Sequence, residues 1–278
     1  MGLEPALPVS GQTPLVGEDD GYLLDNRQAE AGTRFDAFTH LFDPVTFRHL
    51  DAVGTGPGWR CWEVGAGGPS VPTWLVGRVG PTGSVLATDV DLSQLPTDAP
   101  FSVLRHDVGT DEPPGAGFDL VHARLVLVHV PARSRALDTL VAAVRPGGWV
   151  VVEDADPALQ PLACPDEHGP AEALANRLRR GFRALLAERG AELAFGRTLP
   201  RLLRERGLED VGAEAFFPIA SPACTQLELA TVSQVRHRLV AAGLATDVEV
   251  DDHLRNVGGG TMDLATAPLV SAWGRRPG

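Results

Sequence analysis

The sequence predicts an α/β fold with a parallel, doubly wound sheet. Short apolar runs alternate with helical patterns between about residues 59 and 153. A glycine-rich turn follows the first of these runs directly, at residues 65–68. Near-continuous apolar runs are typical of strands that are covered on both faces. Repeated strand–helix units of this length imply parallel strands with right-handed crossovers.

The composition limits the classes of function. The 278 residues are 44% hydrophobic and 22% charged, which is typical of a globular protein. A net charge of −12 argues against a nucleic-acid partner, which would need a basic face. No apolar run approaches the roughly 20 residues of a membrane span, and the first residues lack the pattern of a signal peptide. We therefore expect a cytoplasmic protein with no membrane or nucleic-acid partner.

The cysteines and basic residues exclude several chemistries. Cys61, Cys164 and Cys224 are odd in number and have no CxxC spacing, so we expect neither a disulfide framework nor a metal site. All 24 basic residues counted as lysine or arginine are arginine. Without a lysine, the chain can form neither a P-loop phosphate site nor a pyridoxal Schiff base.

The first 55 residues are predicted to lie outside the sheet. Residues 1–20 have the composition of a flexible tail. Residues 21–55 are predicted to form an N-terminal helical lid, with an apolar helix face in 28–42. Asp43 and Pro44 suit the N-cap and first turn of a second helix, which Gly54 would end.

The sheet is predicted to come from two parts of the chain. Residues 56–160 form the ligand-binding core, with strands at 59–64, 84–88, 101–105, 118–122 and 148–153 and helices at 71–79 and from Pro131. Residues 208–278 complete the sheet, with strands at 211–219 and 268–275 around a helix at 225–243. Residues 161–207 are predicted to be a helical cap insertion, with helices at 171–189 and 197–206. Glutamates lie among the arginines of that insertion, which favours a solvated or interface surface over a nucleic-acid surface.

Polar residues follow three consecutive predicted strands. Glu63 stands two residues before Gly65, Asp89 closes the second strand, and His106-Asp107-Val108 closes the third. These positions lie at the carboxyl ends of strands, the edge at which open α/β sheets bind ligands. A carboxylate at residue 89 could bind both hydroxyls of a ribose, and residues 106–108 suit an adenine edge.

The segments WRCWEVGAGG, VLATDVD, RHDV, FDLVHARLVLVHVP and RPGGWVVVED occur in this order. Together they resemble the class I S-adenosylmethionine-dependent methyltransferases, and most closely the actinobacterial natural-product enzymes of that class. The resemblance covers about residues 20–278. It implies a Rossmann-like sheet of seven strands, the last of them antiparallel.

The resemblance also implies roles for individual residues. Around the methionine and ribose of the cofactor it places Glu63, Gly65, Ala66 and Gly67, with Asp89 on the ribose. On the adenine it places Val90, Asp107 and Val108, and on the amino-acid portion Ala123, Arg124 and Arg34. Each has a structural alternative: Asp89 could cap a turn, Asp107 could form an Asx turn, Glu63 could satisfy loop N–H groups, and Arg34 could form a surface ion pair. Pro69 departs from the family pattern, which has glycine there.

The implied reaction is methyl transfer from S-adenosylmethionine to oxygen, nitrogen or carbon of a small-molecule acceptor, with S-adenosylhomocysteine as the second product. A secondary metabolite is the expected acceptor. His129 is the candidate general base, because histidine has a suitable pKa; it could instead pack under the loop. Tyr22, Asp154 and Asp156 are candidate acceptor-binding residues, although the two aspartates could simply solubilise a turn. The sequence leaves open whether the protein forms a homodimer.

Three alternative hypotheses about the function remain. A methyltransferase-like scaffold could catalyse a cyclisation or rearrangement without transfer, and Pro69 keeps that alternative open. A nicotinamide-dependent oxidoreductase would use a similar first unit, but Ser70 stands at its third glycine position. A pure interaction protein would have its cofactor pocket filled by side chains.

Overall fold

A computed structural model describes residues 30–278 and confirms the predicted sheet. Its seven strands have the order β3-β2-β1-β4-β5-β7-β6, and β7 runs antiparallel to both of its neighbours. The strands are β1 (Arg60–Val64), β2 (Ser84–Asp89), β3 (Ser102–Arg105), β4 (Phe118–Arg124), β5 (Val144–Ala155), β6 (Glu209–Phe216) and β7 (Leu269–Arg275).

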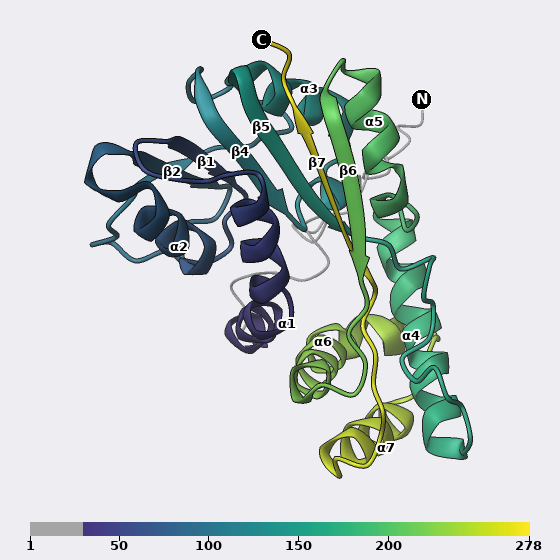
Figure 1. The fold of residues 1–278 in the computed structure, drawn as a ribbon. Coiled ribbons are helices and arrows are strands. Elements are labelled where there is room, and N and C mark those ends of the chain that lie inside the picture. Colours follow the sequence, from purple (N-terminus) through teal and green to yellow (C-terminus); the bar gives the residue numbers. More distant parts are fainter. Residues whose placement is uncertain (1–29) are drawn as a thin grey trace, which may run out of the picture.

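Seven α-helices surround the sheet in the described part of the chain. They are α1 (Glu30–Ala52), α2 (Ser70–Val79), α3 (Arg133–Ala143), α4 (Pro170–Glu188), α5 (Leu199–Glu205), α6 (Pro222–Ala241) and α7 (Asp247–Gly258). In Figure 1, α1 crosses one face of the sheet, whereas α4, α6 and α7 lie together beyond the ends of β6 and β7. None of these helices is long and apolar enough to cross a bilayer.

Both faces of the central strands are buried, which explains their continuous apolar sequence. Leu120 packs toward α1 and α2, while its neighbour Val121 packs toward α3 and α5. Val150 and Val151 of β5 divide between the two faces in the same way. Because successive side chains of a strand point to opposite faces, each residue of such a strand must be apolar to be buried without a partner.

The N-terminal region forms one helix where the sequence predicts two. Helix α1 continues through Pro44, whose ring is exposed. A proline removes one helical hydrogen bond. Burial of Leu41, Phe42 and Leu50 along α1 stabilises the continuous helix despite that loss. Asp43, predicted as an N-cap, instead directs its carboxylate away from the helix toward Ser70 and Arg124.

The helical region of the second half is divided differently from the prediction. Helix α4 packs with α6 and α7 around Leu178, Leu239 and Val250. Helix α5 packs instead on the sheet through Leu199 and Leu203, so residues 161–207 do not form one cap. Helix α7 was not predicted, although its capping box, Thr246 with Glu249, is a sequence signal for a helix start.

Candidate active site

A cavity of about 1020 Å³ opens at the carboxyl ends of β1, β2 and β4. Its walls come from four regions of the chain: the N-terminal half of α1, the glycine-rich loop after β1, the ends of β2 and β3, and the segment after β4. Arg238 of α6 closes one side. The cavity joins segments that are far apart in sequence, so its existence depends on the tertiary fold.

The glycine-rich loop, residues 65–69, bends between β1 and α2. Gly65 and Gly67 have φ values of 59° and 61°, which L side chains rarely adopt. A Cβ atom on Gly65 would lie 2.4 Å from a methyl group of Val126, so a side chain there would clash with the segment after β4. The loop therefore presents bare backbone to the cavity, as a group that binds close to the chain requires.

Asp89 is the carboxylate nearest to this loop. Its Oδ2 accepts a hydrogen bond from the backbone N–H of Gly67 (2.9 Å), and its Oδ1 accepts from that of Asp91 (3.0 Å). Although Asp89 is only 7% exposed, it lines the cavity. Each carboxylate oxygen can accept a further hydrogen bond, so Asp89 both braces the loop and can still bind hydroxyl groups.

The end of β3 forms the next part of the wall. Asp107 is exposed and lines the cavity; its Oδ1 accepts from the Gly109 N–H (2.8 Å), which is the Asx geometry that the sequence leaves as an alternative. His106, the first residue of the segment that the sequence assigns to an adenine edge, is buried, with Nε2 2.9 Å from the Glu112 carbonyl oxygen. Its Nδ1 has no hydrogen-bond partner among residues 30–278.

Apolar side chains also line the cavity. Phe35 and Phe38 come from α1, and Leu125 and Val126 come from the segment after β4. Leu125 has a φ of 58°, an uncommon conformation for leucine, which turns the chain sharply after β4. His129 lies in the same wall. Burial, together with the charges of Arg34 and Arg133, lowers the pKa of His129 to about 4, so its imidazole is neutral at pH 7.

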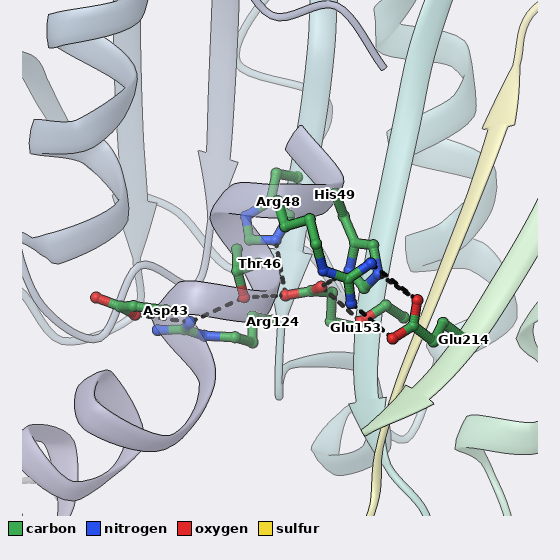
Figure 2. Close-up of polar contacts among 9 residues, drawn as sticks. Asp43, Thr46, Arg48, His49, Arg124, Glu153 and Glu214 are labelled. Carbon is green, nitrogen blue, oxygen red and sulfur yellow. Dashed lines mark hydrogen bonds and ion pairs between the residues drawn. The ribbon is translucent and has the colours of Figure 1, made fainter. Parts of the chain in front are cut away.

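A row of polar side chains crosses the sheet beneath the glycine loop. His122 has Nδ1 2.6 Å from Glu63 Oε2 and Nε2 3.4 Å from Glu153 Oε2. Burial opposes its protonation, but the two carboxylates outweigh burial and raise the pKa of His122 to about 9. It is therefore an imidazolium at neutral pH. Figure 2 shows the row between α1 and the sheet, with Glu153 close to Thr46 and His49.

Comparison with known proteins identifies the family. The family described as "Methyltransferase domain" matches residues 25–213. This chain belongs to that family. Membership confirms the predicted enzyme class, a methyltransferase, and the predicted methyl donor of that class, S-adenosylmethionine.

Relatives with known names agree with this assignment. The methyltransferase is 28% identical to methyltransferase str2 of Strobilurus tenacellus over 221 residues, which are 76% of each chain. It is 33% identical to methyltransferase str3 of the same fungus over 112 residues, or 38% of this chain and 39% of that one.

Two solved structures share the fold at 14% identity. Phosphoethanolamine N-methyltransferase 2 of Haemonchus contortus superposes with a TM-score of 0.57 over 93% of this chain, which spans only 60% of that longer protein. A protein described as a methyltransferase from an antibiotic biosynthesis pathway of Anabaena variabilis superposes with a TM-score of 0.56, covering 83% of this chain and 96% of that one.

Most of the residues predicted for the cofactor do line the cavity of the methyltransferase. These residues are Arg34, Gly65, Ala66, Gly67, Asp89, Val90, Asp107, Val108 and Arg124. Arg34 is nonetheless buried, and its Nη1 donates to Gln234 Oε1 (2.5 Å). Arg124 Nη1 donates to Asp43 Oδ1 (2.8 Å) and to Thr46 Oγ1 (3.0 Å). Both arginines therefore line the cavity and also connect segments that are far apart in the sequence.

Two predicted cofactor residues are buried beneath the cavity instead. Glu63 is 2% exposed and directs its carboxylate to His122. Burial raises the pKa of Glu63. Ala123 lies in the core on the opposite face of β4. For Ala123 the reason is strand geometry, because successive residues of a strand point to opposite faces of the sheet and Arg124 takes the face that lines the cavity.

The candidate acceptor residues do not meet in the cavity either. Strand β5 continues to Ala155, so Asp154 stays in register with Val270 of β7 and is fully buried. Burial raises the pKa of Asp154 well above its usual range. Asp156 is buried and held by Arg197, whose Nε and Nη2 lie 2.7 and 2.6 Å from its two oxygens. The third candidate, Tyr22, lies outside the described residues.

Pro69 fits the loop without strain. It occupies the N-cap of α2 with a φ of −83°, close to the value that proline imposes. Its carbonyl oxygen accepts from the Thr73 N–H (2.9 Å), so the helix starts normally at Ser70. The departure from glycine at this position therefore leaves the loop geometry intact.

Proposed function

We propose that this methyltransferase transfers a methyl group from S-adenosylmethionine to a small-molecule acceptor by in-line displacement. The observation that carries the proposal is that one cavity is lined both by the glycine loop and Asp89 and by the apolar side chains near His129. Donor and acceptor can then meet in one space, as a direct transfer requires.

The donor side has the groups that the cofactor needs. The bare backbone at Gly65 and Gly67 would admit the methionine and ribose, Asp89 would accept from the ribose hydroxyls, and Asp107 would accept from the adenine amino group. S-Adenosylmethionine supplies a methyl group already activated on a sulfonium. The protein therefore contributes mainly proximity and orientation. Val90 and Val108 would pack against the adenine, and Arg34 and Arg124 would face the amino-acid portion.

The acceptor side favours a small, partly apolar molecule. Phe35, Phe38 and Val126 line the cavity and would contact the apolar part of such an acceptor. The Anabaena protein is described as belonging to an antibiotic biosynthesis pathway, and we propose a secondary metabolite as the acceptor here as well. The two named relatives are fungal, so the comparisons do not support an actinobacterial subgroup.

Titration calorimetry on the full chain tests the proposed function. We expect S-adenosylmethionine and S-adenosylhomocysteine to bind and NADH not to bind. Incubation with a panel of phenols, carboxylic acids and amines should then yield S-adenosylhomocysteine. The second product should be heavier than the acceptor by one CH₂ unit, about 14 Da. NADH binding without S-adenosylmethionine binding would refute the proposal. A converted acceptor of unchanged mass, with no S-adenosylhomocysteine, would favour the rearrangement alternative.

His129 is proposed as the general base for an oxygen acceptor. Replacing it by asparagine should lower kcat by less than about 100-fold, because an imidazole with a pKa of about 4 is a weaker base than one that titrates near the working pH, and should leave the Kd for S-adenosylhomocysteine unchanged. Because the pKa of His129 is lowered to about 4, its imidazole stays neutral from pH 8 to pH 5, and it should cause no fall in rate across that range. His237→Asn, on an exposed position of α6, is the control. Equal pH–rate profiles and equal kcat for His129→Asn and the unaltered enzyme would exclude a catalytic role.

We also propose that the protein is cytoplasmic, that it does not bind nucleic acid and that it forms a homodimer. Sedimentation velocity of the full chain would decide the oligomeric state.

A further inference from the structure

The polar row beneath the glycine loop spans five strands on one face of the sheet. Glu63 of β1 is in register with His122 of β4, and Arg124, two residues further along β4, is in register with Glu153 of β5. Glu153 pairs in turn with Ser271 of β7, and Ser271 with Glu214 of β6. Because register partners and residues two apart point to the same face, all six side chains face α1.

Helix α1 supplies the donors that complete this row. Thr46 Oγ1 donates to Glu153 Oε2 (2.5 Å), and His49 Nδ1 lies 3.2 Å from Glu153 Oε1. Ser271 Oγ donates to that same Oε1 (2.6 Å). Glu153 is fully buried, and its carboxylate is stabilised by these hydrogen bonds, by His122 and by the positive charge of Arg124. Such a buried carboxylate tolerates little displacement of its partners.

The row reaches both flanks of the glycine loop. On one side Glu63 precedes Gly65 by two residues and bonds to His122. On the other side Ser70, the first residue after Pro69, donates to Asp43 of α1. Asp43 and Thr46 both accept from Arg124. A continuous chain of contacts therefore runs from Ser70 through α1 and Glu153 to Glu63.

Helix α1 also forms a wall of the cavity. The residues that line it lie in its N-terminal half, up to Thr39, whereas the contacts with the row begin at Asp43. The C-terminal half of α1 does not line the cavity, so it can respond to a ligand only through other residues.

We propose that this row is a positioning device that keeps α1 and the glycine loop in register, so that binding of the cofactor and docking of α1 are coupled. Thr46 and Glu153 are its positioning residues, and they act through Arg124 and the loop rather than by touching the cofactor. The inference rests on the proposed cofactor site. Coupling of this kind changes the affinity for the cofactor because the energy of ordering α1 is shared between the two events.

Hydrogen exchange and calorimetry on the full chain test the coupling, with S-adenosylhomocysteine as the ligand. In the unaltered enzyme the ligand should slow exchange in the loop region, residues 65–79, and also in residues 43–52 of α1. Thr46→Val keeps the shape of the side chain but removes its hydroxyl. This variant should lose the protection of residues 43–52 and bind the ligand about tenfold more weakly. Thr46→Ser restores the hydroxyl and should restore both.

A matched control lies on the same helix. His40→Gln changes an exposed side chain of α1 whose Nδ1 lies 2.7 Å from the carbonyl oxygen of Asp36 in that helix, and it should leave affinity and protection unchanged. If Thr46→Val does not fold, Ser70→Ala tests the other flank of the loop and should also uncouple residues 43–52 from the ligand. Normal affinity and normal protection of residues 43–52 in the folded variant would overturn the inference. An unaltered enzyme that binds no S-adenosylhomocysteine would instead overturn the proposed function and this inference with it.

Discussion

Replacing Asp89 by alanine is expected to weaken binding of S-adenosylhomocysteine about 100-fold or more. The carboxylate accepts from the backbone N–H groups of Gly67 and Asp91 and is proposed to accept from the ribose hydroxyls. Hydrogen bonds to a charged group contribute about 1.5–3 kcal/mol each. The substitution would remove the bond to the ligand and also release the loop that must lie close to it.

Calorimetry of three variants and of the unaltered enzyme measures this effect. Asp98→Ala, at an exposed position of the connection between β2 and β3, should bind as the unaltered enzyme does. Asp89→Asn keeps one carbonyl acceptor, so its affinity for S-adenosylhomocysteine should lie between those of Asp89→Ala and the unaltered enzyme. If Asp89→Ala binds with normal affinity, Asp89 merely caps the turn at the end of β2, which is the alternative that the sequence leaves open.

Replacing Glu153 by alanine is expected to lower the free energy of unfolding by about 3–5 kcal/mol, because the loss of one member of a buried charged group leaves its partners without compensation. Thr46, Ser271 and His122 would each lose an acceptor in a site closed to water. A loss of this size should lower Tm by about 10 °C in a domain of this length.

Urea unfolding at several pH values measures the loss. Glu214→Gln removes a half-exposed carboxylate at the edge of the same row and should cost no more than about 1 kcal/mol. The pKa of His122 is raised to about 9, above the roughly 6.5 of an unfolded histidine. The stabilisation by His122 is therefore complete below pH 6.5 and is lost as the pH rises toward 9. In Glu153→Ala the free energy of unfolding should fall less between pH 6.5 and pH 9 than in the unaltered enzyme. If Glu153→Ala is as stable as the unaltered enzyme, Glu153 does not have the stabilising role described here.

Much of the donor site could be predicted from the sequence, because its signals are local. Gly65, Asp89 and Asp107 each follow a strand whose apolar run marks its end, and the carboxyl ends of parallel strands share one edge. The number of strands and the antiparallel last strand came from the family resemblance rather than from the pattern of any one segment. Asp154 and Asp156 were misplaced because the apolar pattern of β5 stops before the strand does.

The polar row could not be predicted in this way. Thr46 and Glu153 are 107 residues apart, and neither shows a local pattern that reveals the other. By itself, the sequence determined which segments become strands, where the glycine loop turns and which acids stand at strand ends, since backbone preferences and apolar periodicity act over a few neighbours. Only the tertiary structure decided which acids face the cavity and which are buried with a charged partner. That choice depends on side-chain direction and on contacts between distant segments, which exist only once α1 packs on the sheet.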